Sequence, residues 1–230
     1  MTNPQPVVEA RGVTLSYGET PALRQVSLTL QPGETAAVMG PSGSGKSSLL
    51  HCLAGVLTPG SGEVTVAGVR LDQVSERARS SHRLARMGMV FQFGDLIPEL
   101  TLLENVMLPL QLLGNRAHEA RERATQMLGS LGVAGVADRR AGAVSGGQAQ
   151  RAAVARALVH EPSVVFADEP TGALDTASAD NVLEVTLGLA LQCGSAVLVV
   201  THENRVAAHC EGLLTMSDGA LCHDAREVTA

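Results

Sequence analysis

Residues 40 to 47 have the types and spacing of a loop that binds phosphate. The pattern of Gly, four residues, Gly, Lys and Ser or Thr is met by Gly40, Pro41, Ser42, Gly43, Ser44, Gly45, Lys46 and Ser47. Glycines let backbone N–H groups surround a polyphosphate, because no Cβ atom stands in the way. A lysine can reach the β and γ oxygens, and a serine hydroxyl can bind Mg²⁺. We therefore predict a nucleotide site.

The segments on both sides of this loop support that interpretation. An apolar run over 36–39 precedes it and is typical of a buried strand, and 48–54, beginning at Ser48, continues without Gly or Pro as a helix. The helix N-terminus adds free N–H groups and a positive dipole facing the phosphates. A chance match is the alternative in a chain with 24 Gly, but chance does not explain the strand and the helix together.

Two further strands end in side chains that suit phosphate chemistry. The apolar run 164–167 is followed by Asp168 and Glu169, and the apolar run 196–201 is followed by His202. Beside a phosphate loop, the aspartate is placed to help hold Mg²⁺ and the glutamate to orient a water for in-line attack. A single histidine is more often structural than functional, yet at the end of a core strand in such a protein we expect it to face the phosphates.

A second segment suited to anions lies at 144–151. Ser145, Gly146, Gly147 and Gln148 precede the helix expected over 152–159 and combine a capping serine with glycines and free N–H groups. A simple helix cap is the alternative. One nucleotide rarely needs two such sites, so the segment hints at contact with the nucleotide of another copy.

Composition limits the other functions. The chain has 230 residues, 45% of them hydrophobic, which is enough for a large core without disulfides. A net charge of −6, from 23 acidic and 17 basic residues, argues against nucleic-acid binding. No signal peptide is evident at 1–6, and the apolar window 182–200 is interrupted by polar residues and a turn, so neither export nor a membrane span is expected. The cysteines lack metal-ligand spacing, and we expect reduced thiols at Cys52, Cys193, Cys210 and Cys222.

The remaining segments frame these motifs. Strands are expected over 7–17 and 22–30, forming a hairpin, and Tyr17 is either an ordinary strand-end aromatic or a ring beside the nucleotide. The Arg-rich stretch 75–86 is expected to be a solvated helix, with a basic patch for acidic partners as the alternative. Strands are also expected over 63–68, 87–91, 212–216 and 219–222.

Helices dominate from 93 to about 160. The run 101–114 is apolar on nearly every side and contains Pro109, which predicts a kinked helix or two short ones. It packs either inside the chain or against a partner, and the sequence favours neither. The helix expected over 116–131 has an apolar face, and we expect Glu119 and Arg123 to pair on its other face.

Taken together, these motifs resemble the nucleotide-binding subunit of an ABC transporter. In order and spacing, the match rests on 40–47, Gln92, 145–148, 164–169, 173–175 and His202, and it covers nearly the whole chain. The segment 145–148 is the most specific element, because ordinary phosphate-loop kinases and GTPases lack it. The stretch 91–110 is similar to the subgroup that contains macrolide exporters, lipoprotein-release proteins and cell-division proteins.

The resemblance implies a fold and a division of the chain. The expected fold is α/β, a P-loop NTPase (RecA-like) core with an N-terminal antiparallel β subdomain and an inserted α-helical subdomain. Residues 1–230 would form a single ABC ATPase domain, with 1–92 and 161–230 as the nucleotide-binding core and 93–160 as the helical part.

The resemblance also implies roles. Tyr17 would stack on adenine, the loop would bind ATP, and Ser47, Gln92 and Asp168 would hold or sense Mg²⁺. Glu169 would be the general base or orient the water, with His202 on the γ-phosphate. Two copies would pair head to tail on ATP, so that the trans contacts come from Ser145, Gly146, Gly147, Gln148 and Asp175.

The implied partners are integral-membrane permease subunits, which would hold a cytoplasmic ATPase on the inner face of the cell membrane. Val144 stands where Leu is commonest in the family, and 141–143 lack the usual Pro and acidic or polar residue, so contacts toward the permease can differ. An ATP-gated regulator of a cell-envelope enzyme is the alternative within the subgroup. A soluble ABC ATPase on DNA or ribosomes would need arms, zinc modules or a second cassette, which the sequence lacks.

Overall fold

The strand that leads into the phosphate loop lies inside a six-stranded, mostly parallel sheet. The computed structural model describes residues 5–92, 95–171 and 176–224. The strand order is β10-β9-β3-β8-β7-β6, with β10 antiparallel at one edge. The strands are β3 (Thr35–Met39), β6 (Met87–Val90), β7 (Val164–Asp168), β8 (Ala196–Thr201), β9 (Gly212–Ser217) and β10 (Ala220–Asp224). Because β3, β7 and β8 are parallel neighbours, their carboxyl ends meet at one edge of the sheet.

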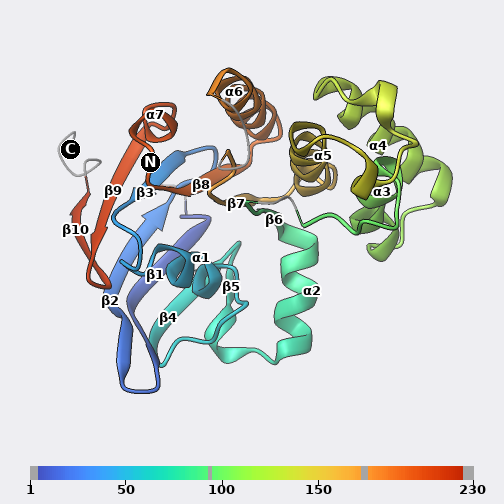
Figure 1. The fold of residues 1–230 in the computed structure, drawn as a ribbon. Helices are drawn as coiled ribbons and strands as arrows, with labels where there is room; N and C mark the ends of the chain where they lie inside the picture. Colours follow the sequence, from blue (N-terminus) through green and yellow to red (C-terminus); the bar gives the residue numbers. More distant parts are fainter. Residues whose placement is uncertain (1–4, 93–94, 172–175, 225–230) are drawn as a thin grey trace.

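A second, antiparallel sheet packs beside the first helix, as Figure 1 shows. Its order is β2-β1-β4-β5, and Val8 pairs with Leu30 on one side and Val66 on the other. The strands are β1 (Val8–Tyr17), β2 (Thr20–Leu30), β4 (Ser61–Val66) and β5 (Val69–Arg70). The predicted hairpin is confirmed, with a turn at 18–19 that is shorter than expected because Thr20 and Pro21 already belong to β2.

The helices surround the parallel sheet. They are α1 (Lys46–Leu53), α2 (Glu76–Arg86), α3 (Leu102–Leu112), α4 (Ala117–Ser130), α5 (Gly146–Leu158), α6 (Thr176–Gln192) and α7 (Asn204–Ala207). Short 3-10 turns occur at Leu71–Gln73, Ala134–Val136 and Ala141–Ala143. Figure 1 places α3 and α4 beyond the β6 edge of the sheet, far from β10, with α5 between them and the sheet.

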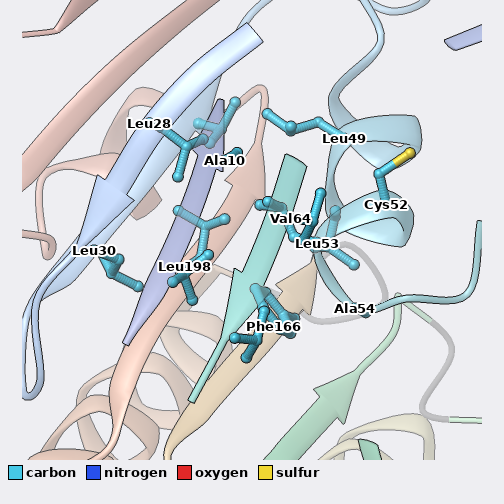
Figure 2. Packing of buried hydrophobic residues seen from close by; sticks show 14 of the residues in the cluster. Ala10, Leu28, Leu30, Leu49, Cys52, Leu53, Ala54, Val64, Phe166 and Leu198 are labelled. Carbon is cyan, nitrogen blue, oxygen red and sulfur yellow. The ribbon is translucent and has the colours of Figure 1, made fainter. Parts of the chain in front are cut away.

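Two apolar clusters fill the chain, one on each face of the parallel sheet. Along β7, Phe166 belongs to the first cluster and Val165 to the second, and Leu198 and Val199 divide in the same way on β8. This alternation follows from the period of two in a strand and explains why both strands are apolar at every position before their last residue. In the first cluster, shown in Figure 2, the Phe166 ring packs with side chains of α1 and the antiparallel sheet.

The apolar run at 101–114 packs mainly inside the chain. It forms one continuous helix, α3, with Pro109 inside it, rather than two short helices. Most of its apolar side chains are buried in the second cluster, whereas Leu112 is 63% exposed and Leu113 is 39% exposed. Thr101 and Glu104 form a capping box that starts the helix.

One predicted side-chain pair is wrong. Arg123 of α4 pairs with Glu161 at 2.8 Å, while Glu119 accepts a hydrogen bond from the Arg116 backbone N–H at the start of its own helix. Helical spacing allows the Glu119–Arg123 contact, but Glu161, which follows α5, offers Arg123 a carboxylate from a different part of the fold. The solvated helix α2 is confirmed, since none of its residues is buried. Among the described residues, no helix is long and apolar enough to span a membrane.

Candidate nucleotide-binding site

The phosphate loop forms one wall of an open cavity of about 770 Å³. The cavity lies where β3, β7 and β8 end, and the end of β1 and the start of β2 form its other side. Loop residues lining it are Pro41, Ser42, Gly43, Gly45, Lys46, Ser47 and Ser48. The remaining walls come from Tyr17, Thr20, Pro21, Ala22, Gln92, Glu169 and His202. The fold thus brings together residues from all of the strand ends that the sequence indicated.

Glycine is required at two positions of the loop by close contacts with neighbouring backbone. A Cβ on Gly40 would collide with the carbonyl oxygen of Met216 on β9, and a Cβ on Gly45 would collide with the carbonyl oxygen of Ala22 on β2. Gly45 also has φ +100, which only glycine adopts without strain. The loop is therefore fixed between two sheets while its outer side faces the cavity.

The side chain of Lys46, near the end of the loop, bonds back to the backbone at the start of the loop. Its side chain is buried, and Nζ donates to the carbonyl oxygens of Gly40 at 2.8 Å and Pro41 at 3.0 Å. These bonds hold the ammonium at the centre of the loop, where it lines the cavity. An ammonium in this position can stabilise polyphosphate oxygens as a compact charge.

Ser47 and Asp168 form an oxygen-rich corner next to the loop. The Ser47 hydroxyl donates to Asp168 Oδ1 at 3.2 Å, which joins the first turn of α1 to the end of β7. A smaller cavity of about 350 Å³ is lined by both residues together with Gln92 and Glu169. Hydroxyl, carboxylate and amide oxygens are the ligands that Mg²⁺ prefers, so these residues fit that ion.

Glu169 and His202 contact each other across the cavity edge. His202 Nδ1 lies 2.6 Å from Glu169 Oε1, and this hydrogen bond with the carboxylate raises the pKa of the imidazole. The Glu169 side chain is only 18% exposed, whereas that of His202 is 63% exposed. With Nδ1 held by the carboxylate, Nε2 of His202 is the nitrogen left to meet a phosphate oxygen.

Tyr17 lines the same cavity as Glu169 and comes from the end of β1. Its ring is 56% exposed, and its hydroxyl lies 3.4 Å from Ser48 Oγ at the start of α1. An exposed ring at a cavity rim offers a flat face on which a base can stack. This position favours the second of the two interpretations of Tyr17.

The segment Ser145–Gln148 does not line this cavity. Ser145 caps α5, and its side chain accepts from the Gln148 backbone N–H at 3.3 Å while Gln148 Oε1 accepts from Ser145 N–H at 3.2 Å. Neither cavity beside the loop includes any of the four residues. Ser145 and Gly146 are instead exposed. The remaining predicted trans contact, Asp175, lies outside the described residues.

Sequence reasoning missed two parts of the site. Thr20, Pro21 and Ala22 line the cavity although they carry no motif, because the hairpin folds back beside the loop. Gln150 was also overlooked, yet its side chain is 1% exposed and bonds to the strand ends that carry Gln92 and Glu169. Gln150 follows Gly147 by three residues, and no local pattern in the sequence marks it as part of the site.

Comparison with known proteins agrees with this geometry. The sequence profile of the ABC transporter family matches residues 23–172. The chain is 43% identical to the lipoprotein-releasing system ATP-binding protein LolD 1 of Caulobacter vibrioides, over 99% of this chain and 98% of that protein.

The chain belongs to the ABC transporter family. It is an ATP-binding subunit that hydrolyses ATP, of the group that includes LolD. The LolD protein of Legionella pneumophila strain Lens is 42% identical, over 86% of this chain and 88% of that protein. A protein of Mycobacterium tuberculosis described as the uncharacterized ABC transporter ATP-binding protein Rv0986 is 39% identical, over 95% of this chain and 90% of its own length.

Solved structures share the fold. The ATP-binding cassette MJ0796, in a dimeric post-hydrolysis state bound to ADP and Pi, superposes with a TM-score of 0.87 at 35% identity, covering 94% of this chain and 97% of that one. The ABC transporter protein cbiO1 of Clostridium perfringens superposes with a TM-score of 0.86 at 25% identity, covering 97% of this chain and 90% of that one. The α/β fold of a P-loop NTPase is thus confirmed.

Proposed function

We propose that this chain is the ATPase of a lipoprotein-releasing type of transporter, which binds ATP in the cavity beside Lys46 and hydrolyses it within a head-to-tail dimer. The observation that carries the proposal is the meeting of Lys46, Glu169 and His202 at one cavity, in a chain that is 43% identical to LolD 1 over nearly its full length. Residues 1–92 and 161–230 would form the nucleotide-binding core, and 93–160 the helical part.

Binding would use the loop and the hairpin. Tyr17 would stack on the adenine, while the backbone N–H groups over 40–48 and the ammonium of Lys46 would hold the phosphates. Ser47, Asp168 and Gln92 would hold or sense Mg²⁺, which when bound neutralises part of the phosphate charge. The bonds of Lys46 to the Gly40 and Pro41 carbonyl oxygens support this role, because they already hold the ammonium within the loop that would bind the phosphates.

Hydrolysis would depend on Glu169. Its carboxylate would orient a water for in-line attack on the γ-phosphorus, where a new P–O bond forms as the bond to the β-phosphate oxygen breaks. The proton of that water would pass to the Glu169 carboxylate, and ADP would leave. His202, held by Glu169 through Nδ1 and with a raised pKa, would donate from Nε2 to a γ-phosphate oxygen.

A dimer would complete the site. Ser145 is exposed and lies away from the cavity of its own chain, which supports the proposal that the segment Ser145–Gln148, with Asp175, contacts the ATP of a second copy. The MJ0796 structures are described as dimeric. Closure on ATP and opening after hydrolysis would then act on permease subunits that hold the ATPase at the inner face of the membrane.

Replacing Glu169 tests the proposed chemistry. We expect Glu169→Gln to bind Mg-ATP and to dimerise but to hydrolyse at least 100-fold more slowly, because the amide cannot accept the proton of the attacking water. The control is Glu161→Gln, which removes an exposed carboxylate paired with Arg123 and should hydrolyse at the parental rate. A Glu169→Gln protein with the parental rate would remove Glu169 from this role.

The dimer is tested separately. We expect Ser145→Arg to abolish the ATP-dependent dimer on a sizing column, because the long charged side chain would stand between two subunits, while monomeric ATP binding remains. Unchanged dimerisation would overturn the trans contact.

A further inference from the structure

Gln150 joins the two turns that carry the reactive groups of the site. It lies on α5, it is 1% exposed, and its Nε2 donates to the carbonyl oxygens of Phe91 at 3.1 Å and Pro170 at 2.7 Å. A glutamine amide has two N–H groups, so these two bonds use both of them. The side chain thus forms a bridge from one helix to two separate strand ends.

Each of the two carbonyls adjoins a residue of the proposed site. Phe91 lies between the end of β6 and Gln92, and its carbonyl belongs to the peptide that Gln92 completes. Pro170 directly follows Glu169 at the end of β7. Since β6 and β7 are parallel neighbours, with Val90 opposite Ala167, one amide can reach both turns.

The Glu169 turn needs support of this kind. Glu169 has φ +47, which is unusual for a residue with a Cβ and is more unusual before a proline. A backbone in such a conformation persists only where its surroundings hold it. The Glu169 N–H donates to the Val200 carbonyl oxygen at 2.9 Å on one side, and Gln150 holds Pro170 on the other.

The same helix begins at the segment Ser145–Gln148, which does not line the cavity. Ser145 caps α5, and Gln150 follows it by a little over one helical turn, about 7.5 Å along the axis. A second side chain of α5, Arg156, donates to the Asp95 carbonyl oxygen at 2.7 Å, which adds another contact to the segment after Gln92. A rigid helix therefore connects its exposed start to both catalytic turns.

We propose that Gln150 is a positioning residue that fixes the Gln92 and Glu169 turns to α5, so that the helix which meets the partner's nucleotide at Ser145 also sets the geometry of its own site. The inference rests on the proposed function, because it assumes the trans contact of Ser145. In a dimer, the nucleotide bound at one site would then influence the catalytic geometry of the other site through an α5 helix and its Gln150 amide.

The substitution Gln150→Met tests this positioning. Methionine has a similar length and volume but no N–H groups, so it releases both carbonyls without placing a charge in the core. We expect monomeric ATP affinity to stay within twofold of the parent, because Gln150 does not line the cavity. We expect kcat to fall at least tenfold, and the Hill coefficient for ATP hydrolysis to fall toward 1.

The matched control is Asn105→Leu. Asn105 is also a buried helical amide, at 0% exposed, but its side chain bonds to the backbone at Ile97 and Thr101, away from the cavity. Both variants are measured well below their melting temperatures. We expect Asn105→Leu to lose stability and to keep kcat within twofold of the parent.

The outcomes separate the inference from the proposed function. If the parent hydrolyses ATP in a Glu169-dependent way and Gln150→Met keeps kcat and the Hill coefficient within twofold of the parental values, Gln150 is a structural residue and the inference is overturned. If kcat falls only in proportion to ATP affinity, the positioning role is likewise overturned. If the parent itself does not hydrolyse ATP, the proposed function fails first.

Discussion

Asn105→Leu isolates one buried amide that holds the segment before α3. Asn105 Oδ1 accepts from the Ile97 N–H at 2.8 Å, and Nδ2 donates to the carbonyl oxygens of Ile97 and Thr101, each at 3.0 Å. Leucine has the same branching at Cγ, is somewhat larger and is apolar like the buried Leu102 and Val106 of the same helix, but it makes none of these bonds.

The expected loss of stability follows from the partners that each group keeps after the substitution. Thr101 O also accepts from the Asn105 backbone N–H, and Ile97 O also accepts from Leu100 N–H, so both carbonyls keep a partner. Only the Ile97 N–H loses its side-chain acceptor. The three bonds of 3.0 Å or shorter cost about 1 kcal/mol each, and burying leucine returns about 1 kcal/mol, so the free energy of unfolding should fall by about 2 kcal/mol.

For a chain of 230 residues, this corresponds to a melting temperature lower by about 4 to 8 °C. Differential scanning calorimetry of both proteins at one pH measures it. The control is Asn115→Ala, which removes a single bond from Nδ2 to the Leu110 carbonyl oxygen at 2.9 Å and should cost about 1 kcal/mol or less. A shift for Asn105→Leu no larger than that of the control would refute the reasoning.

Three other predictions follow from the site and the cysteines. Gly45→Ala should weaken ATP binding at least tenfold in equilibrium titration, because the new Cβ displaces the loop from Ala22. The control is Gly33→Ala, at φ +74 with open space around it, which should cost about 1 kcal/mol of stability and leave ATP binding unchanged. His202→Ala should lower the free energy of unfolding by under about 1 kcal/mol near pH 6. The difference from the parent should shrink as pH rises through the raised pKa of His202, because the charged pair with the Glu169 carboxylate is then lost. Equal differences at pH 6 and pH 9 in urea unfolding would contradict this. A maleimide at pH 7.5 should label the exposed thiol of Cys222 before that of Cys52, because burial raises the pKa of Cys52 to about 11. Mass spectrometry locates the label, and faster labelling of Cys52 would contradict this prediction.

Local patterns predicted most of the elements and the loop, because those depend on near neighbours. Glycine spacing at 40–47 and the apolar strand before it predicted the phosphate loop, and the structure places Gly40 and Gly45 where no Cβ fits. Ser145 was predicted as a helix cap and it caps α5, although this helix begins at Gly146 and not at residue 152 as expected. The sequence could name Tyr17 as a candidate but could not decide between its two interpretations, since its position at the cavity depends on how the hairpin folds back.

What the sequence alone determined is therefore the chemistry available, namely a lysine in a glycine loop, carboxylates and a histidine after apolar strands, and a capped glycine-rich helix. The tertiary structure alone decided which of these meet. Parallel pairing of β3, β8 and β7 brings Lys46, His202 and Glu169 to one edge, and it leaves Ser145 outside their cavity. It also decided that Gln150 reaches Phe91 and Pro170, because a side-chain bond across 59 residues depends on packing and leaves no periodic signal in the chain.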